Sequence, residues 1–282
     1  MYGASIVRFL RAFLGACNRF NEKGGWVMSS HIAMSMMMAL FPFVLFVVAL
    51  AATLSQDIDV DNLIELVFGS WPDEIAQPIT REVRKVLTSD HSSLLTLGGV
   101  LAIYFASNGV DAVRQAMTRA YRDEDPRPYW RKRLLCLAFV VFGGAIILTA
   151  AALGVALPLY MRFVTDAVPI QIPSWLGSEV FNSVSALCML SAGVAACHYW
   201  LPGDRHPLKQ ILPGVLLTVL LWVLAATGFS YYLARFASYS ATYAGLAGVM
   251  VALIFLYLMG AILILGAEFN GALMKRAGLQ AQ

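Results

Sequence analysis

Six long stretches of the chain contain no Asp, Glu, Lys or Arg, and they limit the possible folds more than any other feature. They cover residues 32–54, 92–110, 134–160, 180–201, 211–233 and 243–267. A helix rises about 1.5 Å per residue, so about 20 apolar residues cross a hydrocarbon layer about 30 Å thick. Helices are required because the lipid interior offers backbone N–H and C=O groups no other partner. The pattern predicts an all-α polytopic membrane protein with six transmembrane helices.

The composition favours a membrane protein over a large soluble core. The 282 residues are 59% hydrophobic and 13% charged, and the mean hydropathy is +0.70. A soluble domain carries about 25% charged residues, roughly twice as many. No low-complexity linker divides the chain. We therefore expect a single membrane domain over residues 1–282.

The basic residues are distributed unevenly between the two sides of the predicted membrane. Of the 20 lysines and arginines, 15 fall in flanks that share one side and 5 in flanks of the other side. Basic flanks stay in the cytoplasm. Because the side with 15 also holds both ends of the chain, the sequence predicts that the N-terminus and the C-terminus are cytoplasmic.

Residues 1–30 are predicted to form a cytoplasmic segment with an amphipathic helix. Apolar side chains recur along one face, at Ile6, Phe9, Leu10, Phe13, Leu14, Cys17 and Phe20. Arg8, Arg11 and Arg19 lie on the other face, which favours a helix on the inner leaflet with these arginines at anionic lipid headgroups. The alternative is a helix packed under the bundle as a cytoplasmic cap.

Residues 55–91 form the longest predicted external segment. Four aliphatic residues from Ile75 to Val86 repeat at helical spacing, and Pro72 stands at a position typical of a helix start. We expect one or two short amphipathic helices on the external face.

Polar side chains collect where the predicted spans meet the cytoplasm. Polar groups in membrane helices are costly, so they are candidates for function. Asp111 and Arg114 are three residues apart and are expected to pair on one helix face. The candidate residues of an inward-facing polar cavity are His31, Ser35, Asn108, Asp111, Arg114, Glu268 and Asn270. The alternative is that these groups only cap helix ends near the headgroups.

Three residues are candidates for a helix kink or hinge. Pro42 lies within the first span, where it removes a backbone hydrogen bond and predicts a kink. Pro213 and Gly214 open the fifth span. Small residues let membrane helices approach closely, and helix breaks also permit the rocking motions of transporters.

The sequence gives no positive sign of catalysis. The histidine and cysteine spacings match no metal site, and no nucleophile motif or phosphate-binding glycine-rich loop is present. We therefore expect no metal, no cofactor and no enzymatic activity. The cytoplasmic segments are short, and their 15 basic residues face 7 acidic ones. This balance argues against nucleic acid as a partner.

Four pieces of sequence resemble the YihY/BrkB family of membrane proteins. They are the opening span from His31 to Pro42, Trp200-Leu-Pro202, Leu212-Pro-Gly214 and Leu263-Ile-Leu-Gly-Ala-Glu268-Phe-Asn270. The resemblance covers residues 20–274 and implies a six-helix protein of the bacterial inner membrane. The family has carried the label ribonuclease BN and has been associated with envelope robustness and with lipid or lipopolysaccharide export. A nuclease would need a basic RNA surface and a metal or acid–base site, so the residues here disfavour that label.

These observations lead to three hypotheses for function. The leading one is a transporter or flippase of an amphipathic envelope molecule, a lipid or a lipopolysaccharide precursor, whose polar head would bind between helices. The alternative is a non-transporting membrane scaffold for envelope enzymes, with large exposed helix faces. An ion or small-solute channel fits less well, because no ring of charged residues lies at mid-bilayer. A homo-oligomer is compatible with each of the three.

Overall fold

The computed structural model describes residues 2–54, 91–121, 124–167, 179–236, 244–276 and 278. Within these ranges the chain forms α-helices and no strand, in agreement with the predicted all-α class. The helices are α1 (Tyr2–Glu22), α2 (Gly25–Leu54), α5 (His91–Tyr121), α6 (Tyr129–Ala167), α7 (Glu179–Trp200), α8 (Leu208–Phe236) and α9 (Ala244–Arg276). The external helices predicted for residues 55–91 lie outside the described residues, apart from His91, which begins α5.

Among the residues that the structure describes, four helices contain segments long and apolar enough to cross a membrane. By length and composition these segments are Thr96–Tyr121, Ser183–Trp200, Leu208–Leu233 and Gly248–Lys275. They overlap the second, fourth, fifth and sixth charge-free stretches of the sequence. The first and third stretches lie entirely within α2 and α6. The fold is therefore that of a helical membrane protein.

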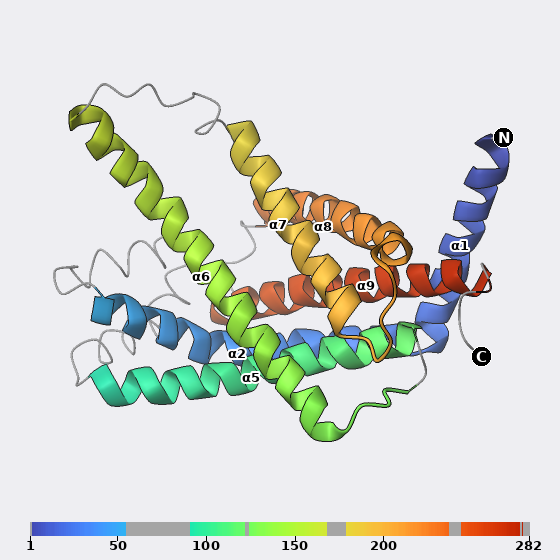
Figure 1. Ribbon diagram of the computed structural model, residues 1–282, viewed down its shortest axis with the longest axis horizontal. Helices are drawn as coiled ribbons and strands as arrows, with labels where there is room; N and C mark the ends of the chain where they lie inside the picture. The colour runs from blue at the N-terminus through green and yellow to red at the C-terminus, as the bar shows by residue number, and fades with distance from the viewer. Residues whose placement is uncertain are drawn as a thin grey trace.

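The helices form a bundle around α2, α5 and α9. These three helices contact one another and run side by side along the length of the molecule (Figure 1). α8 packs on α9, and α7 packs on α8. α6 packs against α5 and crosses it obliquely, whereas α1 lies across the end of the bundle against α9 (Figure 1).

The contact between α2 and α5 is antiparallel and close. Gly109 of α5 lies beside Met36, whereas Gly98 and Gly99 lie beside Phe46. A Cβ on Gly99 would come within 3.1 Å of the Phe46 ring. The glycine therefore lets the ring approach the α5 backbone, as small residues do in membrane bundles.

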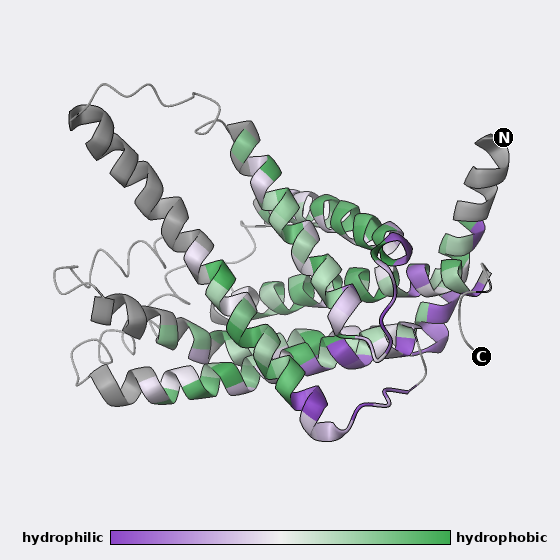
Figure 2. Ribbon diagram, in the orientation of Figure 1, coloured by the Kyte–Doolittle hydropathy of each residue, from purple (hydrophilic) through white to green (hydrophobic). Residues whose placement is uncertain are grey.

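Polar residues gather at one end of the bundle. α5, α7 and α9 end there, α2, α6 and α8 begin there, and α1 covers it. Figure 2 shows hydrophilic residues in these turns and in the connections 124–128 and 201–207. We call this region, made of α1, these helix ends and the two connections, the polar end.

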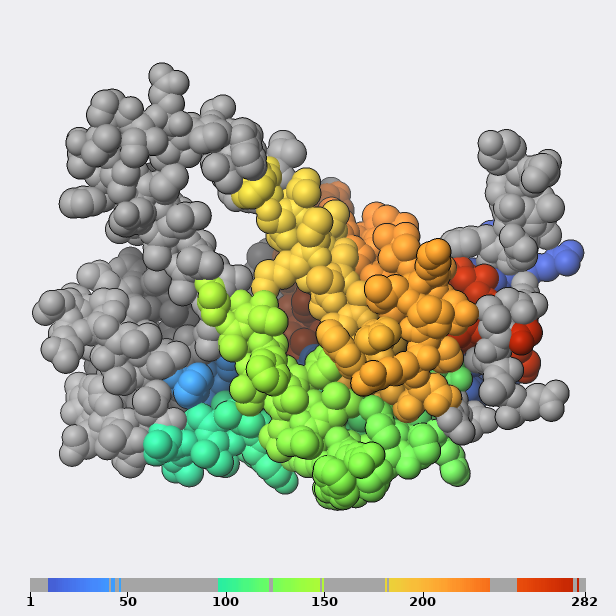
Figure 3. Space-filling view, in the orientation of Figure 1, coloured from blue at the N-terminus to red at the C-terminus, as the bar shows by residue number. Residues whose placement is uncertain are grey.

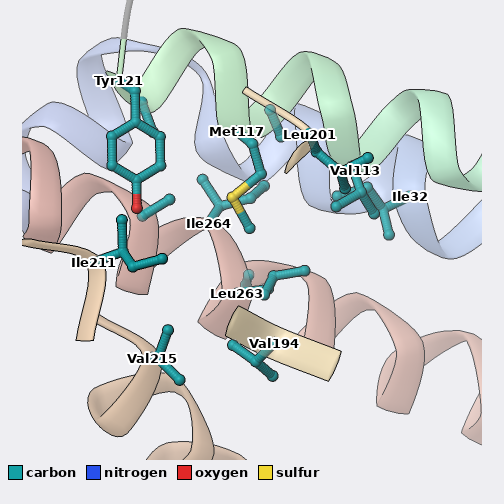
Figure 4. Packing of buried hydrophobic residues seen from close by; sticks show 14 of the residues in the cluster. Ile32, Val113, Met117, Tyr121, Val194, Leu201, Ile211, Val215, Leu263 and Ile264 are labelled. Carbon is teal, nitrogen blue, oxygen red and sulfur yellow. The ribbon is translucent and has the colours of Figure 1, made fainter. Parts of the chain in front are cut away.

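A buried apolar cluster lies beside the polar groups of this end. Figure 4 shows Met117 of α5 pointing toward Ile264 of α9, with Ile211 of α8 and Val194 of α7 in the same cluster. Met117 is fully buried. Lipid is as apolar as these side chains, so close shape matching rather than escape from hydrocarbon holds such contacts.

Local sequence signals set where the helices begin. Gly24 has a φ of 71°, a left-handed conformation that glycine adopts without strain, and it turns the chain from α1 into α2. Pro128 and Pro207 precede the first turns of α6 and α8, and their carbonyls accept the first N–H groups of those turns. Proline suits this position because its missing N–H would have no helical partner there.

Candidate functional site

The seven residues predicted to line a cavity all lie in α2, α5 and α9, but their surroundings differ. His31 is exposed, Ser35, Asn108 and Asp111 are half-buried, and Arg114, Glu268 and Asn270 are buried. The buried residues do not share one surface. Each of them engages its own set of partners.

Three buried side chains from three helices meet at the polar end. Tyr121 of α5 has its hydroxyl 2.6 Å from Nδ1 of His198 in α7. Nδ2 of Asn270 in α9 donates to the same hydroxyl at 2.8 Å. The Tyr121 hydroxyl donates to His198 Nδ1 when the neutral imidazole carries its proton on Nε2, and it accepts from Nδ1–H in the other tautomer. We call this group the Tyr121–His198–Asn270 cluster.

Two imidazoles flank Tyr121. The ring of His206, in the connection after α7, lies 5.3 Å from the Tyr121 ring centroid with an interplanar angle of 33°. Nε2 of His198 and Nε2 of His206 are both buried and have no hydrogen-bond partner among the described residues. Buried polar atoms are usually bonded, so these two nitrogens are exceptional.

Asn270 also binds the backbone of α8. Its Oδ1 accepts from the N–H of Gly214 at 2.6 Å, and its Nδ2 donates to the carbonyl of Ile211 at 2.8 Å. A Cβ on Gly214 would overlap the carbonyl oxygen of Gly266 and the Asn270 side chain. Glycine is therefore required for the close approach of α8 to α9. Ile211 and Gly214, on either side of the Leu212–Pro213 pair, are thus bonded to another helix.

A second buried group is centred on Arg114. Its Nε donates to Oδ1 of Asp111 at 2.8 Å, and its Nη1 donates to Oδ2 of Asp125 at 2.6 Å. Gln115 donates to the other oxygen of Asp111 at 2.8 Å. The predicted pairing of Asp111 with Arg114 is thus present, and a second carboxylate completes it. The Arg114 side chain is 8% exposed and that of Asp125 is 5% exposed, so solvent screens this pair weakly.

Asp125 joins this group to α7. Its carboxylate also accepts from Arg127 Nε at 2.9 Å, and Arg127 Nη2 donates to the carbonyl of Leu201 at 2.6 Å, just past the end of α7. Burial alone raises the pKa of Asp125. The hydrogen bonds from Arg127 and the charges of Arg127 and Arg114 outweigh that effect and hold the pKa below its usual 3.8. We call Asp111, Arg114, Gln115, Asp125 and Arg127 the Arg114 network.

Glu268 is paired with α1. Arg19 Nε lies 2.7 Å from Glu268 Oε2, and Arg19 Nη2 donates to the carbonyl of Ala120 at 2.8 Å. Nζ of Lys23 donates to the neighbouring carbonyl of Arg119 at 2.5 Å. Cations at the carboxyl end of a helix are favourable because the helix dipole is negative there. Arg19, which was expected to face lipid headgroups, is instead used to join α1, α5 and α9.

The remaining predicted residues lie at the edge of this region. Arg133 of α6 donates to Asn108 at 2.8 Å, and its guanidinium lies 5.3 Å from the Tyr104 ring centroid. Ser35 lies on α2 where that helix approaches Gly109. The two contacts of Arg133 fix the start of α6 on α5.

Several partners were missed by sequence reasoning. They are Tyr121 and His198 in the first group, Asp125 and Arg127 in the second, and Arg19 as the partner of Glu268. His198 carried a signal, because it is the one histidine inside a charge-free stretch. Asp125 carried no such signal, since acidic residues are common in polar turns.

No ligand set for a metal stands out in the part of the chain that the structure describes. Groups of three or more His, Cys, Asp or Glu side chains arranged to hold an ion are absent from these residues. The carboxylates of Asp111, Asp125 and Glu268 are instead paired with arginines.

Long apolar helices joined at one end by buried polar groups define an all-helical integral membrane protein. A family model described as Virulence factor BrkB matches residues 16–282, so the chain belongs to the BrkB family. This result confirms the resemblance drawn from the four sequence pieces.

Several named relatives match this chain over different lengths. The ribonuclease-like protein YfkH of Bacillus subtilis is 30% identical over 267 residues, covering 93% of this chain and 94% of that protein. UPF0761 membrane proteins of Tolumonas auensis and Delftia acidovorans are 27% and 26% identical, and the matches cover 64% and 93% of this chain. The matches cover 58% and 62% of those two proteins, less than two thirds of their length. No solved structure matches the chain.

Proposed function

We propose that this chain is an inner-membrane transporter or flippase that moves an amphipathic envelope molecule, a lipid or a lipopolysaccharide precursor, between leaflets. In this proposal the chain crosses the bacterial inner membrane six times. Both termini and the polar end face the cytoplasm.

A recess between α6 and α7 is the observation that carries this proposal. Figure 3 shows the two helices apart, with α9 visible in the floor between them. Both helices carry exposed apolar side chains, among them Phe142 and Ile146 of α6 and Val184 and Leu187 of α7. A recess with apolar surroundings that opens sideways suits lipid tails, which would remain in hydrocarbon while the polar head moves.

The polar end supplies groups for the head of such a molecule. Of the predicted residues, His31 is exposed, and Ser35, Asn108 and Asp111 are half-buried. The charges of Arg114 and Glu268 are neutralised by their ion pairs. While these pairs are formed, the two residues hold segments of the chain together. Opening the Arg114 network would free a guanidinium, which binds phosphate oxygens well.

Hinges and a surface helix complete the proposal. Pro42 lies inside α2, and Pro213 and Gly214 lie inside α8, so both helices have points where bending costs less. We propose headgroup contacts for Arg8 and Arg11, and Arg19 pairs with Glu268. Leu10 and Leu14 of α1 are exposed and would enter the inner leaflet, while Ala12 and Ala16 pack on Phe269 of α9. α1 thus combines the surface helix with the packed cap.

Translocation in reconstituted vesicles tests the proposed function. The purified full chain is placed in vesicles that contain fluorescent phosphatidylglycerol, phosphatidylethanolamine or a lipid A precursor. A membrane-impermeant reductant then reports how fast inner-leaflet probe reaches the outside. Vesicles with protein should lose inner-leaflet fluorescence faster than empty vesicles for at least one probe. Equal rates for the whole panel would contradict the proposal.

One observation favours the scaffold as a second candidate. Exposed leucines repeat every four residues along α8, at Leu212, Leu216, Leu220 and Leu224. Such a stripe fits a neighbouring membrane helix, from a second copy or an envelope enzyme, as well as it fits lipid. Crosslinking from Leu220→Cys in native membranes distinguishes these neighbours, since a lipid contact gives no crosslinked protein.

A further inference from the structure

We propose that the contact between α5 and the start of α6 is a binding site for an anionic phospholipid, whose phosphate is held by Arg133 and Lys132. The lipid belongs to the leaflet that borders the polar end. The site goes beyond the proposed transport, because it lies between α5 and α6 and not in the recess between α6 and α7.

Both helices leave the apolar part of the predicted membrane at this contact. The charge-free stretch of α5 ends at residue 110, two residues past Asn108, and that of α6 begins directly after Arg133. α6 crosses α5 obliquely (Figure 1), and Figure 2 shows hydrophilic residues at the start of α6 followed by apolar ones. A phospholipid places its phosphate at this depth, where the hydrocarbon layer meets the polar headgroup region.

Neutral groups hold the Arg133 side chain in place. Its Nη1 donates to Oδ1 of Asn108 at 2.8 Å, and its guanidinium lies 5.3 Å from the ring centroid of Tyr104. Arg133 is half-buried, yet none of the buried, unbonded nitrogens of the described residues belongs to it, so its other N–H groups remain accessible. The two contacts therefore orient the guanidinium without neutralising its charge.

Other arginines of the polar end are neutralised within the protein. Arg19, Arg114 and Arg127 each pair with a carboxylate. Asp111, the one acid in the sequence of α5, is already paired with Arg114. In the described part of the chain, Arg133 has no carboxylate within ion-pair distance. A partly buried charge at a membrane is favoured by a counter-ion, and here that ion has to come from outside the protein.

Lys132 adds a second positive charge beside Arg133. It is half-buried, and its side chain makes no hydrogen bond or ion pair within the described ranges. From residue 126 to residue 165 the sequence contains no acid. Two adjacent cations complement a phosphate, whereas the ammonium group of a zwitterionic lipid gains no partner from α6. The site therefore favours a lipid with a net negative charge.

Exposed apolar and aromatic side chains surround the two cations. Leu134 of α6 is exposed, as are Val100 and Tyr104 of α5. Tyr129 and Trp130 precede the cations and are also exposed, and these residue types favour the lipid–water interface. The acyl chains of a lipid would cover the apolar surface, which a soluble anion leaves bare. The surroundings of the cations thus fit a phospholipid and not free phosphate.

Native mass spectrometry of the purified full chain tests the site. Phosphatidylglycerol and phosphatidylcholine with identical acyl chains are added separately, and the affinity for the first bound lipid is measured. The wild type should bind phosphatidylglycerol about tenfold more tightly, and Arg133→Gln should remove most of this preference. Lys209→Gln is the matched control, because it removes one exposed charge from the first turn of α8. It should weaken binding less than about twofold.

Two further variants separate the geometry of the site from its charge. Arg133→Lys keeps the charge but loses the planar guanidinium over Tyr104, so its loss of affinity should lie between those of the wild type and Arg133→Gln. Should Arg133→Gln not fold, Lys132→Gln replaces it, because the Lys132 side chain holds no other described residue. It should weaken binding of phosphatidylglycerol about fivefold.

Three results would overturn the proposal. They are equal affinity for the two lipids, equal losses in the site variant and in Lys209→Gln, and displacement of the lipid by an equal concentration of inorganic phosphate. Translocation measured on the same protein separates this site from the proposed function. A wild type that selects phosphatidylglycerol through Arg133 and moves no lipid would refute the transport and leave the binding site in place.

Discussion

The side-chain oxygen of Asn270 accepts a hydrogen bond from the backbone N–H of Gly214 at 2.6 Å, across the crossing of α8 and α9. The bond is possible because neither Gly214 nor Gly266 carries a Cβ at the crossing. A polar bond between membrane helices contributes about 0.6 kcal/mol on average and up to about 1.7 kcal/mol. The crossing therefore depends on shape as much as on the polar bond.

A methyl group at Gly214 should separate the two helices. The Cβ of Gly214→Ala would overlap the Gly266 carbonyl, and overpacking of this kind costs about 1–3 kcal/mol. We expect a clear fall in the thermal unfolding temperature of the purified protein. Gly228→Ala in the same helix is the matched control, because a Cβ there meets nothing within 4 Å. Equal unfolding temperatures for the two variants would contradict the prediction.

Removing Arg114 should leave Asp111 without its ion-pair partner, whereas Asp125 keeps Arg127. Arg114→Met breaks both of its pairs, and breaking a buried pair from one side costs about 3–5 kcal/mol. Adding Asp111→Asn should restore part of that loss, since one uncompensated charge disappears. Arg131→Met, at an exposed position, should change stability by less than about 0.5 kcal/mol. Urea or thermal unfolding measures all three, and the absence of any rescue by Asp111→Asn would count against the network.

The physics of membrane-spanning helices explains which parts of the fold the sequence predicts. The charge-free stretches predict the helices because a lipid-exposed backbone has no other way to satisfy its hydrogen bonds. The partners of the polar groups are not predictable in that way. Tyr121 and Asn270 are 149 residues apart, and helical spacing says nothing about such a contact.

α1 shows why helical periodicity alone misplaced one residue. The sequence places the large apolar side chains on one face, toward the inner leaflet or, in the alternative, toward the bundle. Leu10 and Leu14 are exposed, whereas the small residues Ala12 and Ala16 are buried. Small residues allow the α9 backbone to come close. The resulting rotation of α1 turns Arg19 inward, toward Glu268.

His206 should make stability depend on pH. Burial lowers its pKa below the usual 6.5, and nearby Asp204 opposes this only in part. Because the pKa of His206 is lower in the folded protein than in the unfolded chain, the folded protein binds fewer protons below pH 6.5. The full stability is therefore present above pH 6.5. Stability is then lost as the pH falls from 6.5 toward the lowered value. His206→Phe keeps a ring against Tyr121 and should remove this loss, which thermal unfolding at several pH values would measure. An identical pH profile in both proteins would contradict the prediction.

The proposed orientation can be tested by cysteine labelling in outer-permeabilised cells. Ser70→Cys should react with a membrane-impermeant reagent, because the segment 55–91 is proposed to be external. Glu124→Cys, at an exposed position of the polar end, should react only after the inner membrane is opened. The reverse pattern would mean that the positive-inside argument failed for this chain.

The pair of Arg19 and Glu268 should control the docking of α1. Arg19→Met removes the ion pair and the bond to the Ala120 carbonyl, whereas Glu268→Gln keeps an acceptor and loses only the charge. Hydrogen bonds to charged groups contribute about 1.5–3 kcal/mol, so Arg19→Met should be the more damaging change. The double variant should be less destabilised than the sum of the two single variants, because both act on one contact.

Limited proteolysis provides the structural readout for this pair. Arg19→Met should make α1 more sensitive to cleavage, while α5 and α9 stay protected. Asn18→Ala, at the exposed neighbouring position, should leave α1 as resistant as in the wild type. If Arg19→Met and Glu268→Gln were strictly additive and α1 stayed resistant in both, the ion pair would not hold α1. The apolar contact of Ala12 and Ala16 with Phe269 would then account for the docking alone.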